Sequence, residues 1–290
     1  RSTRGNEMDT FRGTRTLQSF STRWVDPDIL EKTLVGRREL VDRLEELAID
    51  GAGGPNKHQR LIIGVRGSGK THVLRVLHHR LWRNEELKKR LLIVYLLEDE
   101  LGVAAFLDFV VRLLRAIVNW YPEEQQLARE LERVYDLPLE MQERQAVHLL
   151  LQTAGSKDVL IIMENLGLTF DKTRGFGREG QQALRDLVQS HPHFMIFASC
   201  QALMEGIREQ NAPFFGFFKI IHLRRLNLEE SMAFLLAIAS AYGKQDVVDF
   251  LNTPRGRGRT RAIYDFTGGN HRLLVTFYEF ISADSVAKLS

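Results

Sequence analysis

One segment of the sequence combines glycines, a lysine and a threonine in a spacing suited to binding phosphate. Gly64-Val-Arg-Gly-Ser-Gly-Lys-Thr71 matches the pattern G-x-x-x-x-G-K-[ST] in full. Glycines let successive backbone N–H groups turn inward around phosphate oxygens, and the positive end of a following helix reinforces the site. Lys70 would reach the β- and γ-phosphates of a nucleoside triphosphate, and the Thr71 hydroxyl would ligate magnesium. The candidate nucleotide-binding residues here are Gly64, Val65, Arg66, Gly67, Ser68, Gly69, Lys70, Thr71 and His72.

A carboxylate follows a second apolar run, where a magnesium-dependent phosphate site would need one. The run Val159–Met163 ends at Glu164 and Asn165. We assign Glu164 to magnesium, largely through water, and Asn165 then falls where the attacking water is held. Because an amide cannot accept a proton at neutral pH, the hydrolysis rate stays open. Two alternatives remain: Glu164 is the base with Met163 at the magnesium position, or Glu164 and Asn165 are a capping pair after a buried strand.

The elements that must position these residues alternate in type. Apolar runs predict strands, and helical periodicity between them predicts helices, so the pattern favours an α/β fold with a five-stranded parallel sheet covered by helices on both faces. The run Leu91–Leu97 is too continuous for a strand with one buried face. The other expected strands are 61–63, 159–163, 194–198 and 220–223, and the expected helices are 31–49, 70–82, 103–120, 180–190 and 201–209, with a helical stretch over 122–151 broken at Pro138.

Strand signals stop after Asn227, which divides the chain. The remainder reads as helices over 228–242, 245–251, 260–266 and 271–281. We therefore expect a basic extended arm over residues 1–24, an α/β nucleotide-binding domain over 25–225 and a small all-helical lid domain over 226–290. The sequence begins with Arg1 rather than Met, so we also expect the chain to be a fragment of a longer protein.

Composition narrows the class of protein further. The 290 residues are 44% apolar and 27% charged with a net charge of +3, which excludes collagen-like and mostly disordered chains. A single cysteine, Cys200, excludes an internal disulfide framework and a cysteine-based zinc site, and fits a reducing compartment, so we expect a cytoplasmic protein. No apolar stretch is long enough for a membrane helix, and we expect no membrane partner.

The order of these features resembles the AAA+ ATPases, in particular the branch that holds the origin-recognition/Cdc6-like proteins, the ATPases of transposition and the STAND-like ATPases. Leu34-Val-Gly-Arg-Arg-Glu39 resembles the box that contacts the adenine side in that branch. Met163-Glu-Asn-Leu166 stands where the family has its second acidic motif, but departs from the usual Asp-Glu. The resemblance thus implies nucleotide contacts by Val35, Gly36 and Arg37.

Two further motifs in the same order carry the resemblance. Phe197-Ala-Ser-Cys-Gln201 is similar to the sensor-1 strand end, which implies that Ser199 lies near the γ-phosphate. Gly268-Gly-Asn-His-Arg-Leu273 is similar to the sensor-2 motif, which implies that Arg272 reaches the nucleotide from the lid. The resemblance then implies a catalytic set of Lys70, Glu164, Asn165 and Ser199.

Self-association and nucleic-acid binding depend on basic residues outside this set. AAA+ proteins usually form rings or filaments in which an arginine completes the neighbour's site, and Arg208 is our candidate, with Lys219 as a compact cation in the same stretch. The segment 255–261 reads as a basic, flexible loop between lid helices. Its arginines fit contacts to a nucleic-acid backbone, although a solvated loop or an acidic neighbouring subunit would fit equally; they are Arg255, Arg257, Arg259 and Arg261.

The sequence thus predicts an ATP hydrolase that requires ATP and Mg²⁺ and acts as an oligomeric nucleotide-driven switch or motor on a partner effector protein or DNA. One alternative is a nucleotide-gated assembly scaffold or signalling module with little hydrolysis, favoured by Asn165. Another is a DNA-bound regulator of transposition or replication. The fold does not choose among transposition, replication control and antiviral defence.

Overall fold

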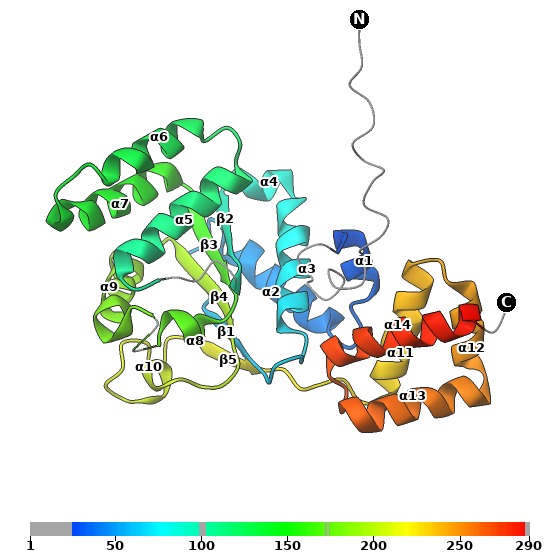
Figure 1. Ribbon diagram of the computed structural model, residues 1–290. Helices are drawn as coiled ribbons and strands as arrows, with labels where there is room; N and C mark the ends of the chain where they lie inside the picture. Colours follow the sequence, from blue (N-terminus) through cyan, green and yellow to red (C-terminus); the bar gives the residue numbers. More distant parts are fainter. Residues whose placement is uncertain (1–24, 99–102, 172, 174, 288–290) are drawn as a thin grey trace, which may run out of the picture. The chain divides into compact units, whose positions relative to one another are not determined.

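The computed structural model describes residues 25–98, 103–171, 173 and 175–287 (Figure 1). The arm expected over residues 1–24 lies outside this part. Contacts between Cα atoms divide the chain into two compact units. The α/β unit spans Arg37–Arg224, and the helical unit joins the described residues up to Gly36 to those from Arg225 onward. Residues 25–36, which the sequence analysis grouped with the α/β domain, therefore group with the C-terminal helices.

A five-stranded parallel sheet forms the centre of the α/β unit, which confirms the predicted fold class. The strand order is β2-β3-β4-β1-β5, so β1 and β3 lie on either side of β4. Every residue of β2, β3 and β4 is buried, whereas β5 is an edge strand with mostly exposed side chains. The strands are β1 (Arg60–Ile63), β2 (Leu91–Leu96), β3 (Asp158–Met163), β4 (Phe194–Cys200) and β5 (Lys219–His222).

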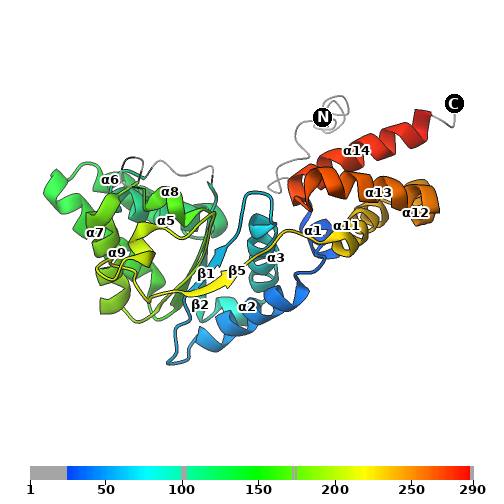
Figure 2. The same ribbon diagram turned by 90° about the horizontal axis from the view of Figure 1, so that it is seen from below.

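Helices cover both faces of this sheet. Figures 1 and 2 show α2 and α3 on one face and α5, α8 and α9 on the other, with α6 and α7 as an outer layer beyond α5. An apolar cluster of buried side chains joins the sheet to α5, α6, α7 and α9, and removal of these side chains from water is the main stabilising contribution. The helices of the unit are α2 (Arg38–Gly51), α3 (Lys70–Trp82), α4 (Glu85–Lys88), α5 (Phe106–Trp120), α6 (Gln125–Val134), α7 (Leu139–Ala154), α8 (Leu166–Thr169), α9 (Gly177–Ser190) and α10 (Glu205–Arg208).

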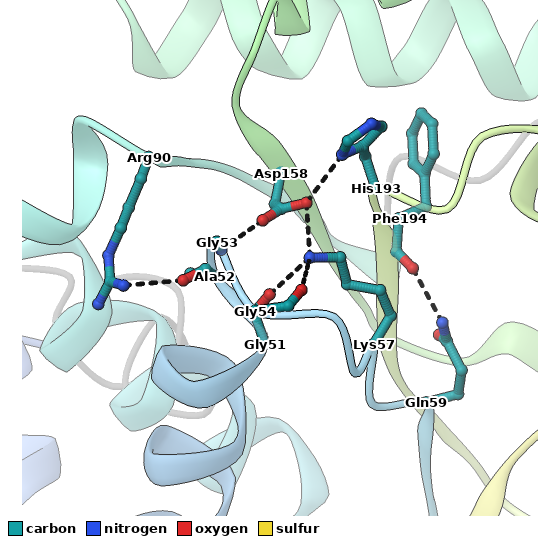
Figure 3. A network of polar contacts seen from close by, with 10 residues as sticks. All are labelled: Gly51, Ala52, Gly53, Gly54, Lys57, Gln59, Arg90, Asp158, His193 and Phe194. Atoms are coloured by element: carbon teal, nitrogen blue, oxygen red, sulfur yellow. Dashed lines mark hydrogen bonds and ion pairs between the residues drawn. The ribbon is translucent and has the colours of Figure 1, made fainter.

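A polar network fastens the amino ends of the strands together (Figure 3). The carboxylate of Asp158, the first residue of β3, is 5% exposed and lies 2.7 Å from the amine of Lys57, which precedes β1. The backbone N–H of Gly53 and the imidazole of His193 also contact this carboxylate. Burial alone would raise the pKa of Asp158, but these hydrogen bonds and the Lys57 charge outweigh it, and the pKa is lowered. The carboxylate therefore stays ionised in the fold.

The same network reaches β4 and β2. The side chain of Gln59 donates a hydrogen bond to the carbonyl of Phe194 and accepts one from the N–H of Ile196. The guanidinium of Arg90, just before β2, donates to the carbonyl of Ala52 at 2.8 Å. Figure 3 shows the Gln59 and Arg90 contacts on either side of the Asp158 cluster. The strand ends are thus tied through side chains as well as through the sheet.

The helical unit contains α1 packed with four C-terminal helices. Its core centres on Leu235, Leu251 and Leu274, which are fully buried. Helix α11 begins with a capping box in which Asn227 and Glu230 bond each other's backbone N–H groups. The helices are α1 (Pro27–Lys32), α11 (Leu228–Ala241), α12 (Gln245–Asn252), α13 (Pro254–Thr267) and α14 (His271–Ala287). No helix of the described chain is long and apolar enough to cross a bilayer.

The prediction of a flexible loop over the basic segment 255–261 is wrong, because this segment forms the first half of α13. Thr253 caps this helix by accepting a hydrogen bond from the N–H of Gly256, and Pro254 follows the cap. A side chain at position 256 would place its Cβ 2.0 Å from the carbonyl of Phe250. Gly256 is therefore required by close packing, not by a turn.

Two helix boundaries also differ from the sequence expectation. The helix expected over 31–49 is two helices, because Thr33–Arg37 leaves helical geometry between α1 and α2. The helix expected over 201–209 shrinks to the single turn of α10.

Candidate nucleotide-binding site

The Gly64–Thr71 loop connects β1 to α3, in the strand–loop–helix order that the sequence predicts. Gly67 and Gly69 have φ values of 79° and 95°, which L side chains rarely adopt. Gly64 lies where a Cβ would meet the carbonyl of Leu223 at 2.5 Å. Helix α3 starts after Gly69, which makes no side-chain capping hydrogen bond, so the N-cap residue leaves the first N–H groups of the helix for another acceptor.

The buried hydroxyl of Ser68 also has no hydrogen-bond partner among the described residues. An orphaned donor inside a turn of N–H groups fits an anionic ligand. Val65 and Arg66 are exposed at the tip of the loop, whereas the side chain of His72 is only 5% exposed and faces the interior. Of the residues expected to contact nucleotide here, His72 can therefore contribute its backbone rather than its side chain.

Lys70 lies folded over the loop. Its amine donates hydrogen bonds to the carbonyl oxygens of Gly64 at 2.6 Å and Val65 at 3.2 Å. Partial burial lowers the pKa of Lys70, and the fields of Cys200, Glu98 and Glu164 oppose that effect. The amine thus sits over the cradle with two carboxylates in its electrostatic environment.

Glu164 meets Thr71 at the carboxyl edge of the sheet. The Thr71 hydroxyl donates to Oε2 of Glu164 at 3.1 Å, and the Tyr95 hydroxyl donates to Oε1 at 2.5 Å. Burial raises the pKa of Glu164, while these two hydrogen bonds lower it. Burial and the neighbouring Glu164 charge raise the pKa of Tyr95 well above its usual range, so this phenol remains a donor. The residue pair assigned to magnesium from the sequence is brought together.

The rings of Tyr95 and Trp120 pack against the ring of His78, and the three rings together form an aromatic wall. The ring of His78, on α3, lies 4.9 Å from that of Tyr95 and 4.6 Å from that of Trp120, measured between centroids. Burial, with the charges of Arg75 and His79, lowers the pKa of His78 to about 3. Its Nε2 has no hydrogen-bond partner within the described chain. His78 is a neutral packing residue that supports the wall.

Asn165 turns the chain directly after Glu164. Its φ of 50° is the one positive value at a non-glycine residue in the described chain. Its N–H donates to the buried hydroxyl of Ser199 at 3.3 Å, and its side-chain Nδ2 donates to Oε1 of Glu98 at 2.9 Å. Although Asn165 precedes α8, its side chain does not cap that helix. Glu164 and Asn165 are therefore not a capping pair, and Ser199 holds the backbone of this turn.

Glu98 is the residue of this cluster that the sequence analysis missed. It lies just past the carboxyl end of β2, as Glu164 lies just past that of the adjacent β3. Because Glu98 directly follows a buried apolar run, as Glu164 does, the sequence contains a signal that predicts a second carboxylate at this edge of the sheet. The acidic run Glu98-Asp-Glu100 instead resembles a solvated turn.

The other predicted residues lie outside this cluster or in the other unit. Arg37 is buried and donates to the carbonyl of Arg224. Val35, half-buried, and Gly36, with a φ of 63°, belong to the helical unit. Arg272 is exposed in the first turn of α14, and Arg208 is exposed on α10.

The fold and the loop between β1 and α3 define a P-loop NTPase architecture. The chain has the fold of origin-recognition/Cdc6-type AAA+ ATPases. The ORC1 protein of Aeropyrum pernix in complex with DNA matches with a TM-score of 0.58 and 13% identity, over 91% of this chain and 68% of that chain. The ORC2 protein of the same organism, in ADPNP–ADP complexes, matches with a TM-score of 0.55 and 14% identity, over 90% and 70%.

A Walker-type ATPase of Pyrococcus abyssi matches with a TM-score of 0.53 and 17% identity, over 84% of this chain and 66% of that chain. The chain therefore spans about two thirds of the length of the structures that it resembles. No protein-family model matches the sequence, and no curated protein matches it.

Proposed function

We propose that this chain binds ATP with Mg²⁺ on the Gly64–Thr71 loop and hydrolyses it as an AAA+ type nucleotide-driven switch. The contact between Thr71 and Glu164 carries the proposal, because it places a hydroxyl and a carboxylate beside a phosphate cradle. Hard oxygen ligands of this kind suit magnesium, which retains several waters. When bound, the ion supplies neutralisation of phosphate charge.

Each residue of the site has a proposed role in binding or hydrolysing the nucleotide. The loop amides and Ser68 would hold phosphate oxygens, and Lys70 would exchange its carbonyl partners for the β- and γ-phosphates. Thr71 and Glu164 would hold magnesium, and Asn165 would orient the attacking water. Ser199 would act by holding the Asn165 turn.

Lys70→Ala tests nucleotide binding. Titration calorimetry with ATP and with ADP, in the presence of magnesium, should give a loss of at least tenfold in affinity, which corresponds to about 1.4 kcal/mol. Lys89→Ala is the control, because Lys89 is an exposed lysine that pairs with Glu86 in solvent. Wild-type affinity in the Lys70 variant would refute the site.

A nucleotide-gated assembly scaffold with little hydrolysis is the second candidate. The observation that favours it is the amide of Asn165 at the position next to Glu164. Phosphate release measured with and without DNA separates the candidates. Turnover that disappears in Lys70→Ala supports the hydrolase, and tight ATP binding without turnover supports the scaffold.

The helical unit extends the proposal to nucleotide sensing and DNA. On the resemblance, Arg272 would contact the nucleotide, and Val35, Gly36 and Arg37 the adenine side. Self-association, with Arg208 acting on a neighbouring copy, and a partner effector protein belong to the same proposal. Because the similar ORC1 structure holds DNA, we also propose DNA binding through α13.

The helical form of α13 sharpens the DNA test. Arg255 and Arg259 are spaced by one turn, as are Arg257 and Arg261, so the four arginines form two pairs on different sides of the helix. Arg257 and Arg261 are both exposed, and their joint change to alanine should weaken DNA binding in fluorescence anisotropy and reduce its salt dependence. No binding at low salt would remove the DNA proposal.

A further inference from the structure

The two carboxylates at the carboxyl edge of the sheet are held differently. Glu164 is 5% exposed, and each of its oxygens accepts a hydrogen bond, from Tyr95 and Thr71. Glu98 is exposed and accepts one hydrogen bond, from Asn165, through Oε1. Within the described chain, no donor is bonded to its Oε2. Both oxygens of Glu164 are therefore engaged in hydrogen bonds, whereas Oε2 of Glu98 can accept a hydrogen bond from a water molecule.

The position of Glu98 also relates it to the phosphate cradle. β2 and β3 pair in register, so Glu98 and the Glu164-Asn165 turn emerge at the same edge. Burial lowers the pKa of Lys70 and raises that of Glu164, and the charge of Glu98 also acts on both groups, so Glu98 lies within electrostatic range of the lysine that would hold the γ-phosphate. A general base must lie within hydrogen-bond reach of the water whose proton it takes, and a carboxylate with one oxygen unbonded can accept that hydrogen bond.

We propose that Glu98 is the general base for ATP hydrolysis, oriented by Asn165. This inference rests on the proposed ATP hydrolysis. Oε2 of Glu98 accepts a proton from a water molecule as the water oxygen attacks the γ-phosphorus. The bond from the γ-phosphorus to the β–γ bridging oxygen breaks, and ADP leaves with that electron pair. Phosphate forms, and Glu98 then releases its proton to solvent.

The arrangement explains how a chain with an amide after Glu164 can still hydrolyse ATP. The Asn165 side chain cannot accept the proton, but its Nδ2 fixes one oxygen of a carboxylate that can. The base then comes from β2 and its orienting group from β3. Asn165 is a positioning residue in this scheme.

Glu98→Gln is the direct test, because glutamine keeps the size and the acceptor for Asn165 but cannot take a proton. We expect ATP affinity within about twofold of wild type and a steady-state turnover reduced by at least about 100-fold. Glu86→Gln, an exposed glutamate on α4, is the matched control and should leave both quantities unchanged. Wild-type turnover in Glu98→Gln would overturn the inference.

An exchange of the two residues gives a second test with a readout that a structural role would not move. Glu98→Asn alone should lose turnover. Adding Asn165→Glu to it should restore part of the turnover, because the carboxylate–amide pair is rebuilt with the base on β3. Asn165→Glu alone should lower turnover, since it sets two carboxylates against each other. Turnover above wild type in that single variant would overturn the inference.

The outcomes separate this inference from the proposed function. A wild-type chain that binds ATP but releases no phosphate, with or without DNA, overturns the role of Glu98 and leaves nucleotide binding standing. A wild-type chain that binds neither ATP nor ADP with magnesium overturns both.

Discussion

The Thr71 hydroxyl lies 3.1 Å from Oε2 of Glu164, although 93 residues separate the two in the chain. One follows β1 and the other follows β3, and parallel strands bring their carboxyl ends to one edge. The chemistry proposed for this chain depends on that edge.

Thr71→Val should remove the magnesium dependence of nucleotide binding. The loss of one oxygen ligand should weaken ATP affinity in magnesium by about tenfold, with little change in EDTA. Titration calorimetry in both buffers measures the difference. Thr71→Ser keeps the hydroxyl and should behave as wild type; equal losses in the two variants would contradict a ligand role for the oxygen.

Lys57→Met should destabilise the α/β unit by about 3 kcal/mol, because it leaves the buried Asp158 carboxylate without its cation. Urea unfolding at pH 7 measures the change. Lys89→Met is the matched control, since Lys89 pairs with Glu86 in solvent and should contribute less than about 0.5 kcal/mol.

Acid should weaken the same network. The pKa of Asp158 is lowered from its ordinary 3.8 in the fold, so its contribution is complete above pH 3.8 and is lost as the pH falls through the folded value. A Lys57 variant with unchanged stability would show that the Gly53 and His193 contacts suffice.

His78→Phe should flatten the dependence of stability on pH between 6.5 and 5. The pKa of His78 is lowered from 6.5 to about 3, so in this window the unfolded chain binds a proton that the folded chain does not. The contribution of neutral His78 to the free energy of unfolding is complete above pH 6.5. As the pH falls below 6.5 this contribution decreases by about 1.4 kcal/mol per pH unit, which amounts to about 2 kcal/mol by pH 5.

The measurement is the slope of the unfolding free energy against pH, compared with that of wild type. His148→Asn, at an exposed histidine on α7, is the control substitution. Equal slopes in wild type and His78→Phe would show that His78 is protonated normally.

Gly258→Ala should stabilise the helical unit by about 0.8 kcal/mol. Position 258 lies inside α13, and a Cβ there meets nothing within 4 Å, so alanine adds helix propensity without a clash. Gly256→Ala is its counterpart and should destabilise by about 2 kcal/mol through contact with Phe250. Thermal unfolding compares them, and a destabilising Gly258→Ala would argue for a loop.

The fold follows the sequence pattern where helix signals, strand signals and motif spacing agree. The helix expected over Lys70–Trp82 begins and ends as α3 does, because the glycine loop fixes its start and apolar periodicity fixes its face. The sheet and the adjacency of Thr71 and Glu164 followed from buried runs that end at polar residues.

The fold departs from the sequence pattern where local conformational preference and tertiary packing disagree. Alternating arginine and glycine over 255–259 has low helix propensity, yet Gly256 is what lets α13 approach α12. The Thr253-Pro254 start was the available signal for a helix. Glu98 was hidden in an acidic run, and only the pairing of β2 with β3 shows that it faces Asn165.

The polar network around Asp158 lies at the opposite end of the strands from the Gly64–Thr71 loop. If β1 slipped by one residue along its neighbours, the loop that follows it would move by about 3.3 Å, which is enough to separate Thr71 from Glu164. Lys57 and Gln59 anchor the stretch that leads into β1 to β3 and β4. These remote contacts therefore fix the position of β1 relative to β3 and β4, and with it the distance between Thr71 and Glu164 at the other end of the sheet.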